Sequence, residues 1–146
     1  LLLLFSAAGH VAERRLIRSV YWFFLACLMA ALLAWFSGDA GGADPLFAFL
    51  ARLGLEGQRA EFMVSAIRKS IHLSFYGIMA LAVFRAGFSR GHSAMFCLAH
   101  ALFDESRQAF WARVRTGSLF DVGVDMIGAG AVLWWVSREQ AARHRF

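Results

Sequence analysis

The sequence predicts an all-α integral membrane protein, built as a bundle of four transmembrane helices with a short extracytoplasmic helical loop. Three observations favour this fold class. The 146 residues are 60% hydrophobic and 15% aromatic, which is unusual for a soluble domain. The apolar residues gather in runs that approach the roughly 20 residues needed to cross a hydrocarbon core. These runs do not alternate with polar residues, so they suit helices and not barrel strands. The whole chain, 1–146, is expected to form a single domain.

Four apolar segments are predicted to span the membrane. Their bounds are about 16–36, 70–88, 93–110 and 119–136. Ser37-Gly38 closes the first, and a short polar link separates the second from the third. Leu1–Gly9 is apolar but too short to span, and we interpret it as the remnant of a longer precursor. No basic region precedes it, so it is not predicted to be a signal peptide.

The long connection between the first two spans, 38–69, is predicted to contain a short amphipathic helix. Three glycines and the only proline, Pro45, mark a turn at its start. Leucine and phenylalanine then recur at helical spacing between Leu46 and Leu53, and Gly54 ends the pattern. Such a helix can lie at a membrane interface. An ordinary loop helix packed on the bundle is the alternative interpretation.

Basic residues predict the orientation of the bundle. They precede the first span, flank the link between spans two and three, and follow the fourth: Arg14, Arg15, Arg18, Arg85, Arg90, Arg138, Arg143 and Arg145. With four spans these clusters share one side, which the positive-inside rule assigns to the cytoplasm together with both termini. The net charge of +5 does not indicate a nucleic-acid partner, because the arginines are scattered at span ends, where membrane lipids are the expected contacts.

Polar residues from two spans are expected to meet at the outer end of the bundle. Lys69, His72 and Tyr76 are spaced i, i+3, i+7, so they share one face of the second span. Glu105 and Gln108 are spaced i, i+3 at the outer end of the third. Lys69 alone is interpreted as a helix-end anchor whose ammonium group reaches the headgroups.

The fourth span carries two carboxylates in an otherwise apolar run. Asp121 and Asp125 are one turn apart, and Asp125 lies roughly 6 Å deeper. A charged carboxylate costs about 2.5–3.5 kcal/mol at a helix centre, so both are expected to face the protein interior. We expect Asp125 either to pair with a basic side chain or to be protonated. Arg113 and Arg115, in the preceding loop, are expected to lie above the two carboxylates.

Three motifs at these positions resemble VanZ-like membrane proteins. They are K-x2-H-x3-Y from Lys69, D-E-x2-Q from Asp104, and R-T-G-S-L-x-D-V-x2-D-x2-G-A from Arg115. The resemblance covers residues 69–130 and implies that the family's polar positions are Lys69, His72, Tyr76, Asp104, Glu105, Gln108, Arg115, Asp121, Asp125 and Gly128. Residues 109–114, AFWARV, depart from the pattern because they lack the usual Pro-Gly and are one residue longer. Arg113 is therefore a second candidate for the family's arginine.

The resemblance implies a bacterial cytoplasmic membrane protein, named for a member linked to glycopeptide resistance, and it implies no particular reaction. One hypothesis is an enzyme acting at the outer leaflet on a lipid-linked or cell-envelope substrate. Its catalytic residues would be His72, Glu105, Gln108, Asp121 and Asp125. Its substrate-binding residues would be Lys69, Tyr76, Asp104, Arg113 and Arg115.

A non-enzymatic binding or accessory subunit is the alternative. It would recognise a lipid headgroup, a glycopeptide or a larger membrane complex, and the absence of nucleophile triads and phosphate loops favours it. Proton-coupled transport is the third and weaker hypothesis, because no inverted repeat is visible. No cofactor and no metal are predicted; a cation held by Asp121 and Asp125 is a minor option. The polar residues can equally form a buried network that sets helix register, and the glycines of the fourth span can serve helix packing.

Overall fold

The computed structural model describes residues 2–37, 43–111 and 118–143. The described residues are all-helical and contain no strand, which confirms the predicted all-α class. The helices are α1 (Leu2–Ser37), α2 (Asp44–Arg52), α3 (Gly57–Arg85), α4 (Arg90–Trp111) and α5 (Leu119–Arg143).

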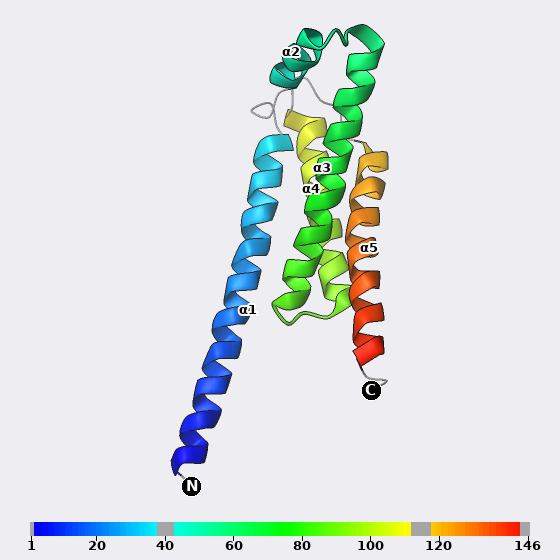
Figure 1. Ribbon diagram of the computed structural model, residues 1–146. Helices are drawn as coiled ribbons and strands as arrows, with labels where there is room; N and C mark the ends of the chain where they lie inside the picture. Colours follow the sequence, from blue (N-terminus) through cyan, green and yellow to red (C-terminus); the bar gives the residue numbers. More distant parts are fainter. Residues whose placement is uncertain (1, 38–42, 112–117, 144–146) are drawn as a thin grey trace.

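Helix α3 is the centre of the arrangement. It packs most extensively on α5, and it also contacts α1, α2 and α4, whereas α1 does not contact α5. The four long helices run lengthwise beside one another, and the short α2 lies across one end (Figure 1). The end of α5 and the beginning of α1 lie away from α2, and α1 projects beyond the other helices (Figure 1).

Two helices extend further than hydropathy predicts. Helix α1 begins at Leu2, so the apolar segment at 2–9 and the predicted first span form one continuous helix. Helix α3 begins at Gly57 and not near residue 70, so the predicted connection is shorter than expected. The physical reason is that charge ends an apolar run but does not end a helix. Eight of the thirteen residues at 57–69 are alanine, arginine, lysine, glutamine, glutamate or methionine, which all favour helical backbone.

The predicted loop helix is present as α2, and glycine ends it as expected. Gly54 has φ +76°, a conformation that favours glycine. Hydrogen bonds from the Leu55 and Gly54 amides to the Leu50 and Ala51 carbonyls, each 3.0 Å, complete a Schellman motif. Leu50 is buried with Ala60 and Val64 of α3 in a small separate core. The helix therefore packs on the start of α3.

Helices α3 and α5 approach each other closely at a pair of glycines. A Cβ atom added to Gly128 would lie 2.1 Å from the Leu73 carbonyl oxygen, and one added to Gly77 would lie 2.9 Å from Val132 Cγ2. Small residues of this kind let helix backbones come together. The packing role predicted for the glycines of this helix is confirmed for Gly128. A Cβ atom added to Gly123 or Gly130 would meet no described atom within 4 Å, so neither glycine marks a close approach between the described helices.

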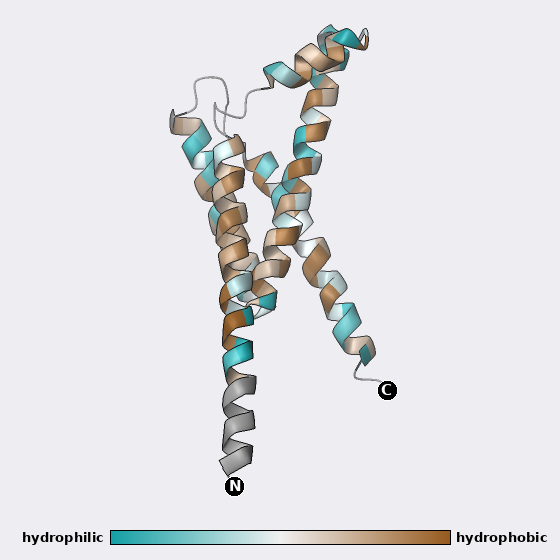
Figure 2. Cartoon of the chain, turned by 60° about the vertical axis from the view of Figure 1, so that its left-hand side comes forward, coloured by the Kyte–Doolittle hydropathy of each residue, from teal (hydrophilic) through white to brown (hydrophobic). Residues whose placement is uncertain are grey.

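The described helices keep much of their apolar surface exposed. Two of them, over Ala12–Ser37 and Leu119–Arg143, are long and apolar enough to cross a membrane. Large apolar side chains along both remain uncovered, including Phe24 (65% exposed), Trp35 (68%) and Leu119 (81%). Hydrophobic residues dominate the middle of the long helices, and hydrophilic ones gather toward their ends (Figure 2).

Candidate functional site

His72 of α3 faces Asp125 of α5, and this pair is the deepest element of the site. The His72 Nδ1 and Asp125 Oδ1 atoms are 3.3 Å apart, and the Asp125 side chain is only 2% exposed. The Asp125 Oδ1 atom has no well-aligned hydrogen bond with any described residue, so the contact is mainly electrostatic. The close crossing at Gly128 lies one turn away on α5 and holds the two helices at this separation.

Lys69 and Asp121 form a second pair between the same two helices, one turn nearer the end of the bundle. The Lys69 Nζ and Asp121 Oδ1 atoms are 3.3 Å apart, and both side chains are more than a third exposed. The ammonium group also lies 4.4 Å from the centre of the Phe120 ring. Lys69 is therefore paired with Asp121. Because α3 begins at Gly57, Lys69 lies inside this helix and not at its end, where it was expected to be an anchor. An ion pair this exposed contributes only about 0–1 kcal/mol in water.

Glu105 binds the beginning of α5. Its Oε2 accepts a hydrogen bond of 2.6 Å from the Ser118 amide, while the Ser118 hydroxyl accepts one from the Phe120 amide. Ser118 is thus the N-cap of α5, and the carboxylate lies at the positive end of the helix dipole. Glu105 is 7% exposed, so its negative charge is held inside the bundle by this helix start.

Asp104 connects α4 to the end of α1. Its Oδ1 accepts hydrogen bonds from Ser37 Oγ (2.7 Å) and Arg107 Nη2 (2.9 Å), and its Oδ2 accepts one from Gln108 Nε2 (2.9 Å). Arg107 Nη2 also donates to the Ala34 carbonyl at 2.6 Å. Asp104 is 1% exposed and is satisfied on both oxygens. This geometry suits a clamp between helices better than contact with a ligand.

Tyr76, another expected substrate-binding residue, is also buried. Its hydroxyl lies 2.9 Å from His100 Nδ1, and His100 Nε2 lies 3.0 Å from the Ala30 carbonyl. A carbonyl only accepts, so Nε2 carries the proton and Nδ1 accepts from the tyrosine. Tyr76 is fully buried, and this chain of hydrogen bonds joins α3, α4 and α1.

The predicted residues thus fall into separate groups. Lys69, His72, Asp121 and Asp125 come together between α3 and α5. Asp104 instead contacts Ser37 of α1, and Gln108 contacts Asp104 on its own helix. Arg113 and Arg115 lie outside the described residues. Sequence reasoning missed Arg107, Ser37 and His100, which complete the hydrogen-bond networks. The i, i+3 spacing of Asp104 and Arg107 was the available signal for one of them.

A pocket of about 280 Å³ opens between α1 and α3 beside His72. It is lined by Leu33, Phe36, Arg68, Ile71, His72 and Phe75. His72 is the one predicted site residue in this lining. Its imidazole reaches Asp125 on one side and the pocket on the other. Nε2 has no hydrogen-bond partner among the described residues.

Within the described helices, no three His, Cys, Asp or Glu side chains are grouped as a metal site would require. Comparisons with protein-family models, curated proteins and solved structures give no match to this chain. The resemblance to VanZ-like proteins therefore rests on the motif residues alone.

Proposed function

We propose that the chain is a VanZ-like, multi-pass protein of the bacterial cytoplasmic membrane, with α1, α3, α4 and α5 as its four spans. Exposed apolar side chains on the membrane-length helices support this placement, because soluble monomers rarely expose large contiguous apolar patches. Helices α3 and α4 carry more charge, but they pack against α1 and α5, and buried polar groups such as Asp104 and Gln108 pair inside the bundle. Both termini are cytoplasmic, and α2 and the polar site face outward.

We further propose that the polar site acts on the headgroup of a lipid-linked or cell-envelope substrate. The observation that carries this proposal is the position of His72 between a buried carboxylate and an open pocket. A carboxylate on one ring nitrogen orients an imidazole and favours its protonated form. His72 is then placed to accept a proton from a ligand in the pocket, or to donate one, through Nε2. Asp125 acts through His72 and is a positioning residue.

A non-enzymatic accessory subunit is the second candidate, and it too has a specific observation in its favour. Two expected polar residues, Asp104 and Glu105, already hold helices together through hydrogen bonds. This leaves few groups for the steps of a reaction. In that case the pocket beside His72 would hold a lipid headgroup or a glycopeptide without turnover, or it would support a larger membrane complex.

The deciding experiment compares His72→Gln and Asp125→Asn with wild-type protein in vesicles that contain lipid-linked cell-wall precursors. Thermal unfolding first establishes that the variants remain folded. The enzyme is supported if wild type turns over the precursor and the variants still bind it but do not turn it over. The accessory subunit is supported if wild type binds the precursor without turnover and the variants lose this binding. If folded His72→Gln matches wild type in both measurements, the proposed site is wrong.

Topology is tested separately by cysteine labelling. In a background with both native cysteines replaced, Gln58→Cys and Gln140→Cys place one exposed reporter near each end of the bundle. An impermeant maleimide added to intact cells should label Gln58→Cys alone. Labelling of Gln140→Cys alone would reverse the orientation, and labelling of both would contradict the four-span arrangement.

A further inference from the structure

We infer that the gap between α1 and α3 binds one acyl chain of a phosphate-bearing anionic lipid, with the phosphate on Arg68. This inference rests on the membrane placement proposed above and extends the site to a named ligand class.

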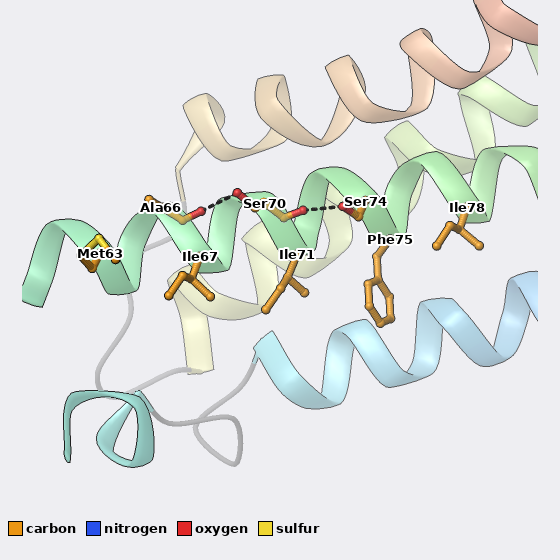
Figure 3. Close-up of a pocket in the computed structure, with 8 residues that line it drawn as sticks. All are labelled: Met63, Ala66, Ile67, Ser70, Ile71, Ser74, Phe75 and Ile78. Carbon is orange, nitrogen blue, oxygen red and sulfur yellow. Dashed lines mark hydrogen bonds between the residues drawn. The ribbon is translucent and has the colours of Figure 1, made fainter. Parts of the chain in front are cut away.

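The apolar part of the site is continuous along α3. A groove of about 440 Å³ runs beside the His72 pocket and shares Ile71 and Phe75 with it. Figure 3 shows Ile67, Ile71, Phe75 and Ile78 on the side of α3 that faces α1. The serines of this groove bond to carbonyls of their own helix, so they leave its wall apolar. An open apolar groove along a helix suits a hydrocarbon chain.

Arg68 supplies a charge in the pocket that adjoins this groove. It lines the pocket and is partly buried, yet it has no hydrogen bond or ion pair with any described residue. The nearby carboxylate of Asp121 is already paired with Lys69 at 3.3 Å. A half-buried guanidinium without a partner is costly in an apolar setting, so an incoming anion would be stabilised there.

The position of Arg68 along α3 matches the depth at which a lipid phosphate lies in a membrane. Arg68 and Arg85 lie about 25 Å apart along α3 at 1.5 Å per residue, close to the roughly 30 Å thickness of a hydrocarbon core. A lipid whose phosphate lies at Arg68 would therefore extend its chains along α3 toward Arg85. The planar guanidinium binds phosphate oxygens in pairs, and His72 offers a second polar group in the same lining.

Lipid retention by purified protein tests the inference. Protein in mild detergent is mixed with phosphatidylglycerol or with diacylglycerol of identical acyl chains, which lacks the phosphate, and bound lipid is counted by native mass spectrometry. Wild type should retain phosphatidylglycerol about tenfold better, since one charge-assisted contact is worth about that factor. Arg68→Gln should abolish this preference, and Arg68→Lys should keep only part of it. Arg59→Gln removes an exposed arginine outside the pocket lining and should behave as wild type.

Two further measurements distinguish binding of the phosphate from binding of the acyl chain. Ile71 is 47% exposed, so Ile71→Trp should fill the groove and lower retention of both lipids without disturbing the core. Soluble glycerol phosphate, which has no chain, should not displace bound phosphatidylglycerol at equal concentration. Equal displacement would show a plain phosphate site and overturn the acyl-chain inference.

The outcomes also separate this inference from the proposed function. Asp125 does not line the pocket, so Asp125→Asn should keep lipid retention while losing the function assigned to the His72 pair. The lipid site is overturned if wild type retains the two lipids equally. It is also overturned if Arg68→Gln and Arg59→Gln lose the preference for phosphatidylglycerol to the same extent. Either result leaves the His72 proposal standing. If wild type keeps its lipid preference while folded His72 variants stay active, the lipid site stands and the His72 proposal is wrong.

Discussion

Replacing Gly128 by alanine perturbs the crossing of α3 and α5 that brings His72 to Asp125. The added Cβ would lie 2.1 Å from the Leu73 carbonyl oxygen and 2.8 Å from its carbonyl carbon. Carbon and oxygen approach to about 3.3 Å in the closest ordinary contacts, so the helices must separate by roughly 1 Å. The obstacle is backbone, which cannot turn aside as a side chain can. The separation should also lengthen the 3.3 Å contact between His72 and Asp125.

The magnitude follows from two opposing effects. Overpacking costs typically 1–3 kcal/mol, and a backbone clash of this size belongs at the upper end. Alanine recovers about 1 kcal/mol through its better helix propensity. The net loss for Gly128→Ala is therefore about 2 kcal/mol in the free energy of unfolding.

Gly130→Ala is the matched control. It makes the same chemical change two residues along the same helix, where an added Cβ meets nothing within 4 Å. It should leave the free energy of unfolding unchanged or raise it by up to about 1 kcal/mol. Unfolding in detergent micelles, titrated with sodium dodecyl sulfate, measures both variants. If Gly128→Ala proves as stable as Gly130→Ala, the close helix approach is wrong.

Three further substitutions test the networks around the site. Asp104→Asn should lower stability by about 2–3 kcal/mol, because it leaves the partly buried Arg107 without its ion-pair partner; an unchanged unfolding midpoint would contradict the clamp. Glu105→Gln should cost about 1 kcal/mol by weakening the contact at the start of α5, with a larger loss of amide protection there than elsewhere. Tyr76→Phe should cost about 1 kcal/mol by removing the hydrogen bond to His100; the same loss in a His100→Ala background would show that the two side chains are not coupled.

Local chemistry determined much of the helical arrangement. Apolar runs, the glycine at position 54 and the serine at position 118 are recognisable in the sequence, because helix formation and capping depend on neighbouring residues. Helical spacing likewise placed Lys69 and His72 on one face, and both now meet α5 through that face. The starts of α1 and α3 were missed because polar helix formers continue a helix after its apolar run has ended.

Only the tertiary structure decided which polar groups meet. Asp125 lies beside His72, and Asp104 uses Arg107 of its own helix, because partner choice depends on the rotation and register of each helix. The glycines of α5 show the same dependence. Gly128 and Gly130 are the same residue two positions apart, yet only Gly128 meets the backbone of α3. Composition and spacing carry no information on which side of α5 its neighbour approaches, whereas the packing of α3 against it selects one side.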